Sequence, residues 1–464
     1  MDYQFDLVSI GSGPAGQRAA VQAAKLGRRA GLIERSRLLG GVCVGAGTIP
    51  SKTFREAVLS VSGGAGLDGR PALRPETRPT AEQLLQRVNS VVERESRVVE
   101  DQLGRNDVEV ISGEASFKDP HTLVVKSEGG WREVTAASIV LAVGTRPGPV
   151  PGVAADGETI ISSDDIMSLK RIPRTLAVVG AGVIGIEYAS MFGALGVQVW
   201  LMERRDRPLE FLDQEIVDEL IHQMRMRNVM LRPGEAVARV EVVEGPPKRV
   251  VLELESGKRM VADLALFAVG RIGATDALNL PAAGLTADDR GRIKVDENFR
   301  TAVPHIFAAG DVVGYPSLAA TSSEQGRLAA CHALGVAAKP MASHFPVGIY
   351  AIPEISMAGA PEHELTKQKV PYEVGIARYR EIARGQIVGD DSGLLKLLFH
   401  RADRRLLGVH VIGTGATELL HIGQAVLGLG AGLDYFLDTV FNYPTLAECY
   451  KVAALNAANK LATG

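Results

Sequence analysis

The amino-acid sequence predicts an α/β protein with two Rossmann-like domains and a smaller α+β domain at its C-terminal end. A short apolar strand that runs into a Gly-x-Gly-x-x-Gly turn and then a helix occurs at residues 5–25 and again at 176–191. After about residue 344 the pattern changes to strands such as 393–399 and 407–412, followed by helices to the end. At 464 residues the chain is long enough for about three domains.

The first fingerprint follows the apolar run 5–10 and consists of Gly11, Gly13 and Gly16. The first glycine permits the tight turn, the second lets backbone N–H groups approach a pyrophosphate, and the third allows close packing of helix on strand. Glu34 ends the next apolar run, about where an acid should accept a hydrogen bond from a ribose hydroxyl. The glycine motif alone would be weak evidence, but strand, glycines, helix and acid together predict a dinucleotide site.

The second fingerprint consists of Gly180, Gly182 and Gly185 after another apolar strand. Two fingerprints predict two bound dinucleotides, and a chain that holds both is suited to moving a hydride between them. The next strand, 197–202, ends at Glu203, which should bond the 2′-hydroxyl of NAD and repel the 2′-phosphate of NADP. The following arginines could pair with that phosphate, so two interpretations stay open: use of both NAD(H) and NADP(H), or NAD specificity with a solvated loop. These arginines are Arg204, Arg205 and Arg207.

Two further strand ends favour FAD at the first fingerprint. The apolar run 301–309 predicts a strand that ends in Gly310 and Asp311, where a carboxylate can accept a hydrogen bond from the ribityl chain of a flavin. The run 139–143 predicts a strand that leads into the turn at Gly144. Because these segments lie on either side of the second fingerprint, we expect an FAD domain that is interrupted by the NAD(P) domain and resumes after it.

Over essentially its whole length the chain resembles the pyridine nucleotide-disulfide oxidoreductase family. Besides the two fingerprints, the resemblance rests on segments 40–52 (GGVCVGAGTIPSK), 182–192, 348–356, 421–425 and 441–448. It implies a homodimer or a higher homo-oligomer, in which the C-terminal motif of one subunit reaches the flavin of its partner. The implied divisions are an FAD-binding domain (1–150), an NAD(P)-binding domain (151–269), the return of the FAD-binding domain (270–343) and a dimerisation domain (344–464).

Two departures from the family pattern indicate that the chain has no disulfide substrate. Disulfide reductases of the family carry Cys-x4-Cys within the segment 40–52, but here Cys43 is followed by Thr48 at the second position. A single thiol cannot cycle between dithiol and disulfide. In the C-terminal motif Tyr443 replaces the acid/base histidine while Glu448 is retained, and a tyrosine with a pKa of about 10 is a poor proton shuttle at neutral pH. Cys43 could be an apolar contact or a catalytic thiolate.

The resemblance implies Si-specific hydride transfer from NADPH to NAD+ through FAD, at one nicotinamide site and in a ping-pong cycle. The alternatives are an NAD(P)H-dependent quinone or dye reductase, an oxidase, and a non-catalytic flavin redox-sensing module. Lys52 is expected near the flavin N5 region and paired with Glu187, since opposite charges favour both ionised forms. The expected catalytic residues are Lys52, Glu187, Tyr443, Glu448 and Cys43, and the expected cofactor-binding residues are Gly11, Gly13, Gly16, Glu34, Arg35, Gly41, Cys43, Lys52, Gly144, Gly180, Gly182, Gly185, Glu203, Arg204, Arg205, Gly270, Gly310 and Asp311.

Composition excludes several function classes. A net charge of −3 gives no basic field for nucleic acid or an anionic membrane. No apolar run approaches the ~20 residues of a membrane span, and the chain begins almost directly with a core strand, which leaves no room for a cleavable signal. Three cysteines offer no disulfide scaffold, and the histidines have no metal-ligand spacing. We expect a soluble cytoplasmic enzyme without a metal, whose partners are nicotinamide nucleotides.

Overall fold

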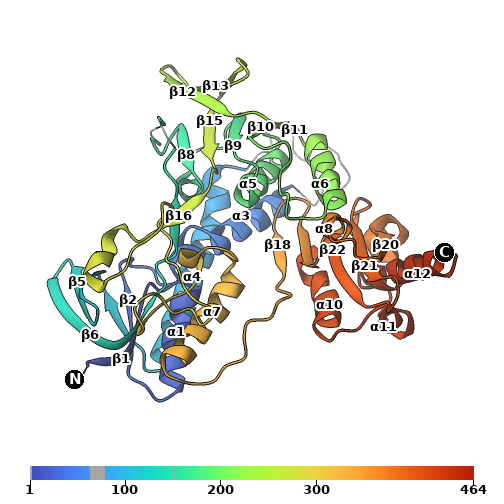
Figure 1. Ribbon diagram of the computed structural model, residues 1–464. Helices are drawn as coiled ribbons and strands as arrows, with labels where there is room; N and C mark the ends of the chain where they lie inside the picture. The colour runs from blue at the N-terminus through green and yellow to red at the C-terminus, as the bar shows by residue number, and fades with distance from the viewer. Residues whose placement is uncertain (1–2, 63–78, 151, 154, 464) are drawn as a thin grey trace. The chain divides into compact units, whose positions relative to one another are not determined.

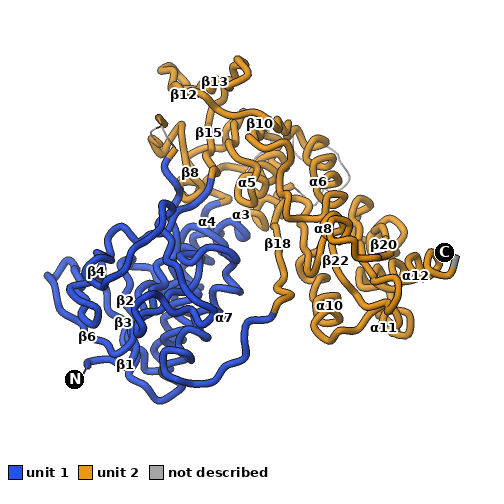
Figure 2. The backbone as a smooth tube through the Cα atoms, viewed as in Figure 1, with its two compact units in different colours: residues 1–54, 85–149, 270–342 blue, residues 55–84, 150–269, 343–464 orange. Residues whose placement is uncertain are grey.

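The computed structural model describes residues 3–62, 79–150, 152–153 and 155–463 (Figure 1). The chain divides into two compact units (Figure 2). The first contains Met1–Phe54, Leu85–Pro149 and Gly270–Ala342, and the second contains Arg55–Leu84, Val150–Val269 and Ser343–Gly464. The α/β fold expected from the sequence is confirmed in both units. The segment 62–80 is rich in Gly, Pro and Arg, a composition that predicts a loop, and it lies almost wholly outside the described residues.

A seven-stranded sheet forms the centre of the first unit, in the order β3-β2-β1-β6-β5-β4 with β17 beside β6. β1, β2, β3, β17 and the C-terminal half of β6 run parallel, so their carboxyl ends meet at one edge. β17 pairs with β6 although the second fingerprint separates them in sequence. The strands are β1 (Phe5–Ile10), β2 (Ala30–Glu34), β3 (Glu109–Ser112), β4 (Glu114–Asp119), β5 (Thr122–Ser127), β6 (Gly130–Leu141) and β17 (Ile306–Ala308).

The prediction of a strand over 301–309 is only partly correct. β17 covers its last part, because Pro304 has no backbone N–H to donate and Ile306 N bonds back to Val303 O in a turn. The hydroxyl of Thr301 also donates to Ile306 O (2.8 Å), which replaces the ladder bonds of a longer strand.

Two helices of the first unit pack closely against each other: α1 (Pro14–Lys25) and α7 (Ala319–Ala333) (Figure 1). A Cβ added at Gly326 would lie 2.0 Å from Ala15 O, so only glycine permits this approach. α1 is rich in alanine and buries its small side chains against the sheet. The remaining elements of this unit, or shared with the second, are α2 (Gly41–Gly45), α3 (Thr48–Val61), α4 (Ala81–Gly104), β7 (Thr145–Pro147), β16 (Arg271–Gly273), η3 (Asp276–Leu278), η4 (Leu280–Ala283) and η5 (Asp311–Val313).

The second unit contains a parallel five-stranded sheet in the order β11-β10-β9-β15-β8. The second fingerprint lies between β9 and α5, which is apolar around its circumference and buried over most of its length. An antiparallel three-stranded sheet, β12-β13-β14, follows in sequence. The bounds are β8 (Ile160–Ser162), η2 (Asp164–Ser168), β9 (Thr175–Val179), α5 (Val183–Ala194), β10 (Gln198–Glu203), α6 (Gln214–Met226), β11 (Val229–Pro233), β12 (Val237–Val243), β13 (Arg249–Leu254), β14 (Arg259–Ala262) and β15 (Leu264–Phe267).

An antiparallel sheet in the order β18-β19-β22-β21-β20 completes the second unit. Its central strands β21 and β22 are almost wholly buried and agree with the runs 393–399 and 407–412 expected as strands. None of the described helices is both long and apolar enough to cross a membrane. The bounds are β18 (Val347–Ile349), β19 (Ile355–Gly359), α8 (Glu362–Lys367), β20 (Tyr372–Arg378), η6 (Tyr379–Glu381), α9 (Ala383–Val388), β21 (Leu394–His400), β22 (Leu406–Ile412), α10 (Ala416–Gly428), α11 (Leu433–Asp438) and α12 (Glu448–Thr463).

Candidate functional site

The first glycine turn joins β1 to α1, and its three glycines meet different steric requirements. Gly11 has φ +103°, and a Cβ there would lie 2.4 Å from Ala142 O. A Cβ at Gly16 would lie 1.8 Å from Gly11 O, whereas one at Gly13 would meet nothing within 4 Å. The space beside Gly13 is therefore open at the N-terminus of a helix, where a phosphate finds backbone N–H donors.

Glu34 is buried at the end of β2, and its carboxylate organises the turn. Its Oε2 accepts hydrogen bonds from Ser12 N (2.8 Å) and Ser12 Oγ (2.6 Å), and its Oε1 accepts one from Ser36 N (2.8 Å). Ser12 Oγ in turn accepts a hydrogen bond from Gly40 N (2.9 Å). Sequence reasoning missed Ser12, which links the fingerprint to the segment 40–52.

Gly41 follows in that segment, and its backbone lies directly against the first glycine turn. It has φ +59°, and a Cβ would lie 2.9 Å from Gly13 Cα. Both the left-handed backbone and the close approach require glycine here. The expected FAD-contacting residues Gly13 and Gly41 are thus brought together by the fold.

A cavity of about 60 Å³, partly open to solvent, adjoins the first turn. Ile10, Gly11 and Glu34 contribute to its lining, together with Val143 and Leu278. Arg35 also lines it and forms an exposed ion pair with Glu114 (3.3 Å). Apolar walls beside a carboxylate that can accept hydrogen bonds from ribose hydroxyls suit the adenosine half of a dinucleotide, so the residues present fit FAD.

Cys43 lies in α2, and Thr48 begins α3. Burial raises the pKa of the Cys43 thiol, although a side-chain hydrogen bond with Thr48 opposes this shift. The thiol therefore stays protonated at neutral pH, which favours the apolar-contact interpretation over the thiolate. Lys52 is half-buried in α3, and its Nζ donates to Ser51 Oγ (3.3 Å).

Asp311 lies at the carboxyl end of β17, next to Gly310, which has φ +82°. Burial raises the pKa of Asp311, while the charge of Arg271 and a hydrogen bond from Ser322 lower it less strongly. Gln325 of α7 accepts a hydrogen bond from Gly310 N (2.8 Å) and holds the turn. A carboxylate held at this edge could accept hydrogen bonds from a polyol.

Gly144 and Gly270 both have positive φ angles, +63° and +119°, beside the short strands β7 and β16. Arg271 donates from Nε to Thr145 Oγ1 (3.0 Å) and from Nη2 to Thr145 O (2.9 Å). Both predicted glycines therefore occupy turns where the chain passes through the left-handed region. Arg271 was not among the predicted site residues.

The second glycine turn repeats the constraints of the first. Gly180 has φ +99°, and a Cβ there would lie 2.5 Å from Ala268 O. A Cβ at Gly185 would lie 1.9 Å from Gly180 O, and one at Gly182 would again meet nothing within 4 Å. The same arrangement of open and crowded positions fits a second dinucleotide.

Glu203 is buried at the end of β10, and its carboxylate is paired with an arginine. Its Oε2 accepts a hydrogen bond from Ala181 N (2.8 Å), as Glu34 does from Ser12. Arg205 donates from Nε to Oε1 (3.0 Å) and from Nη2 to Oε2 (3.1 Å) of Glu203. Burial raises the pKa of Glu203, but these hydrogen bonds outweigh it and leave the pKa below its ordinary value. Arg204 is exposed.

The remaining expected catalytic residues lie in the second unit. Glu187 of α5 is buried, and its Oε1 accepts a hydrogen bond from Tyr350 N (2.8 Å). Lys52 belongs to the first unit, so its pairing with Glu187 stays a prediction. Tyr443 is 74% exposed, and Glu448 accepts a hydrogen bond from Thr445 N (3.4 Å) at the start of α12.

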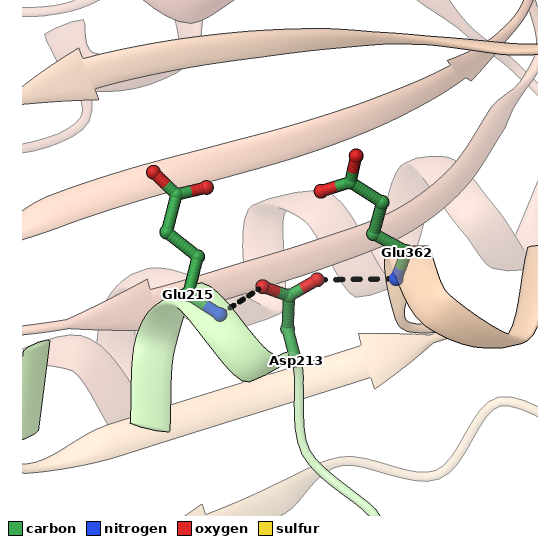
Figure 3. A group of neighbouring side chains, drawn as sticks. All are labelled: Asp213, Glu215 and Glu362. Carbon is green, nitrogen blue, oxygen red and sulfur yellow. Dashed lines mark hydrogen bonds between the residues drawn. The ribbon is translucent and has the colours of Figure 1, made fainter. Parts of the chain in front are cut away.

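A cluster of carboxylates, Asp213, Glu215 and Glu362, lies elsewhere in the second unit (Figure 3). Asp213 accepts hydrogen bonds from the backbone N of Glu215 (3.2 Å) and of Glu362 (3.1 Å). The Nζ of Lys396 donates to a carboxylate oxygen of all three residues. An ammonium group thus takes the central position that a metal ion would need, and the cluster is structural.

Comparison with known proteins agrees with the presence of two dinucleotide-binding turns. Residues 5–326 match the family described as "Pyridine nucleotide-disulphide oxidoreductase", and 345–454 match its dimerisation domain. The chain is 51% identical over 464 residues to a soluble pyridine nucleotide transhydrogenase of Mycobacterium bovis strain BCG, covering 99% of this chain and 98% of the relative. A protein of the same name from Photobacterium profundum is 44% identical, with 98% of each chain covered. Among solved structures, the HOCl-induced flavoprotein disulfide reductase RclA from Escherichia coli has a TM-score of 0.87 at 26% identity, covering 97% of this chain and 99% of that chain.

Proposed function

Because the chain belongs to the pyridine nucleotide-disulphide oxidoreductase family, we propose that it is an FAD-dependent soluble NAD(P)+ transhydrogenase. It transfers hydride from NADPH to NAD+ in a ping-pong cycle, with Si stereospecificity and without a redox disulfide. FAD supplies the two-electron chemistry when bound. The protein binds the two nucleotides in turn, orients them, and places the charged side chains of Lys52 and Glu187 near the flavin ring.

One observation carries this proposal: Thr48 occupies the position where a second thiol would be needed. Its hydroxyl hydrogen-bonds to Cys43, and burial keeps that thiol protonated. A lone protonated thiol cannot relay electrons to a disulfide substrate. The acceptor must then be a molecule that reaches the nicotinamide site itself, and the second glycine turn selects nucleotides.

We assign charge stabilisation near the flavin ring to Lys52, with Glu187 as its partner. Tyr350 N already fixes one oxygen of the Glu187 carboxylate, which keeps the side chain in one orientation. A held anion favours the charged form of a neighbouring lysine. Replacement of Lys52 by Met should therefore slow flavin reduction and change the flavin potential; a normal potential and rate would contradict the assignment.

Arg205 is the basis of the proposed use of both coenzymes. With NAD(H) bound, Glu203 accepts hydrogen bonds from ribose hydroxyls. With NADP(H) bound, Arg205 turns from Glu203 to the 2′-phosphate, which a planar guanidinium binds with two parallel hydrogen bonds. The exposed Arg204 lies beside it and adds positive charge.

A homodimer is the proposed active form, with Tyr443 and Glu448 acting across the interface. The dimerisation-domain match supports it, as do large exposed apolar side chains within 429–455. Light scattering combined with activity at decreasing protein concentration tests this, because an active monomer would contradict it. These exposed side chains are Leu429, Tyr435, Val440, Tyr443 and Leu455.

The four-segment domain division stays a prediction, and so does a cytoplasmic location. All three cysteines are free thiols, which agrees with a reducing compartment. Cell fractionation with a tagged chain tests the location; recovery from the periplasm or outside the cell would contradict it.

Anaerobic stopped-flow spectroscopy tests the function directly. The FAD-loaded protein is first mixed with NADPH and then with NAD+, while flavin absorbance is recorded and NADH is quantified. We expect rapid bleaching followed by rapid recovery with NADH formed. Bleaching without recovery by NAD+ would point to a quinone or dye reductase or an oxidase, and slow bleaching by every nicotinamide nucleotide would point to a non-catalytic redox-sensing module.

A further inference from the structure

The segment 350–352 is bonded through its backbone to buried side chains from two different helices. Tyr350 N donates to Glu187 Oε1 (2.8 Å), and Ile352 N donates to Ser190 Oγ (3.0 Å), both on α5. Between them, Ala351 O accepts a hydrogen bond from Arg55 Nε (3.0 Å), on α3. Successive residues therefore bond to α5, α3 and α5 again, all within the second unit.

Arg55 is unusually buried for an arginine, at 8% exposure. Its Nη2 lies 3.6 Å from Glu354 Oε2, and Glu354 is itself only 6% exposed. Burial raises the pKa of Glu354, which the charge of Arg55 partly offsets, and Thr417 Oγ1 donates a hydrogen bond to it (3.4 Å). A buried charge pair of this kind tolerates little movement, because loss of either partner leaves an uncompensated charge.

Each of the two helices also carries one of the residues assigned to the flavin site. On α3, Lys52 precedes Arg55 by three residues, so the two side chains lie on one face of the helix. On α5, Glu187 precedes Ser190 by three residues, and Ser190 Oγ also donates to Glu187 O (2.7 Å). Any rotation or slide of α3 that moves Arg55 must move Lys52 with it.

We propose that Arg55 is a positioning residue for transhydrogenation. Its contacts with Ala351 O and Glu354 fix the rotation of α3 and hence the placement of Lys52. The neighbouring backbone N–H groups of the segment 350–352 fix Glu187 on α5. This inference rests on the proposed roles of Lys52 and Glu187. Arg55 touches neither nucleotide in this scheme and acts only through Lys52. The planar guanidinium suits the task because it donates in two fixed directions at once.

Three single variants and one double variant of the FAD-loaded full chain test the proposal, and each is compared with Lys52→Met. Arg55→Gln removes both the charge and the planar guanidinium. Arg55→Lys keeps the charge but lacks the guanidinium's fixed N–H donors. Glu56→Gln is the matched control. Glu56 is 53% exposed and accepts a hydrogen bond from Arg55 Nη1 (2.7 Å) on the solvent side, so its loss leaves Ala351 O and Glu354 bonded. The double variant Arg55→Gln/Glu354→Gln covers the case in which Arg55→Gln alone fails to fold, because it removes both buried charges.

The measurements are the flavin midpoint potential, the visible flavin spectrum and the rate of flavin reduction by NADPH. Arg55→Gln should slow reduction about tenfold, since small displacements of a catalytic group cost rates of this order or more. It should shift the potential in the same direction as Lys52→Met does, with Arg55→Lys intermediate and Glu56→Gln unchanged. Added to Lys52→Met, it should have little further effect, because coupled residues are not additive.

Two results would overturn the proposal. In the first, Lys52→Met changes potential and rate, but Arg55→Gln leaves both unchanged or lowers only thermal stability and FAD content. In the second, the effects of Arg55→Gln and Lys52→Met on the rate and the potential are additive in the double variant. A Lys52→Met variant with a normal potential and a normal reduction rate would be a different result. It would contradict the role proposed for Lys52, and this inference would fall with that role.

Discussion

At the scale of single residues, Glu34 and Glu203 end equivalent strands but differ in their surroundings. Each accepts a 2.8 Å hydrogen bond from the backbone N–H that follows the first glycine of its turn. Glu34 takes its other hydrogen bonds from Ser12 and Ser36, whereas Glu203 is also paired with Arg205. A carboxylate that is paired with an arginine can accept hydrogen bonds from ribose hydroxyls when NAD(H) binds. When NADP(H) binds, the arginine can instead leave the carboxylate and pair with the 2′-phosphate.

Replacing Arg205 by Ala should weaken the binding of NADPH much more than the binding of NADH. Charge-assisted hydrogen bonds contribute about 1.5–3 kcal/mol, so KM for NADPH should rise roughly tenfold to a hundredfold. Steady-state kinetics with each nucleotide measure this. Arg207→Ala is the matched control, because Arg207 is paired with Asp218 instead. Equal losses for the two nucleotides would refute the assignment.

Replacing Cys43 by Ser should leave transhydrogenation at the same order of magnitude. Burial raises the pKa of the thiol, so little thiolate exists at neutral pH. Because all three cysteines are free thiols, reductive titration of the wild-type protein should consume two electrons per FAD. A loss of about a hundredfold, in the range typical of a lost catalytic group, would restore a chemical role for Cys43.

At the scale of elements, the contact between α1 and α7 supports the first glycine turn. Gly326 allows α7 to lie directly against the backbone of Ala15, at the start of the helix whose N-terminus faces the open space beside Gly13. From α7, Gln325 also holds Gly310 N (2.8 Å). One helix thus supports two predicted FAD-contacting turns.

Replacing Gly326 by Ala should destabilise the first unit and weaken FAD binding. The added Cβ would lie 2.0 Å from Ala15 O, and overpacking of this kind costs about 1–3 kcal/mol. Chemical denaturation and the FAD content of the purified protein measure the effect. Gly104→Ala, at the end of α4, is the control, because its Cβ would meet nothing within 4 Å. Similar behaviour of both variants would show that the helix contact does not limit stability.

At the scale of the whole molecule, a buried lysine joins parts of the second unit that lie far apart in sequence. Lys396 of β21 is 1% exposed and bonds to Asp213 before α6 and to Glu362 of α8. His410, its neighbour across the sheet, is also buried, which lowers its pKa to about 4. Burial raises the pKa of Asp213, but His410 and Lys396 outweigh this and leave it below its ordinary value.

Replacing Lys396 by Met should cost about 3–5 kcal/mol at neutral pH, because it leaves buried Asp213 without its cation. The deficit should shrink in acid as the carboxylates protonate. Wild-type stability should itself fall as pH drops from about 6.5 toward 4, because His410 binds its proton more readily when unfolded, and further below that as Asp213 protonates.

Urea unfolding over a pH series measures both effects. Lys118→Met is the control, because Lys118 and Glu133 form a solvent-exposed pair in the first unit, where an ion pair contributes little to stability. A deficit for Lys396→Met that does not depend on pH would contradict the electrostatic explanation.

Local features of the fold and the site could be predicted because their causes are local. The glycines of both turns and the acids at the strand ends follow from backbone sterics and short-range periodicity. The strand expected over 301–309 was too long, since a turn around Pro304 prevailed over its apolar pattern. The exchange of the second cysteine for Thr48 was visible in the sequence and indicated a thiol-free reaction.

The two glycine turns, the strand ends that follow them and the missing second thiol could be predicted without a structure, because each depends on residues adjacent in the chain. The partners of the buried polar side chains could not, because they depend on how distant segments pack. Arg55 reaches Ala351 across 296 positions and Lys396 reaches Asp213 across 183, and no short-range pattern specifies such pairs. Burial then makes these pairs specific, because a charged group removed from water must be paired with an opposite charge or hydrogen-bonded to the polar atoms that packing brings beside it.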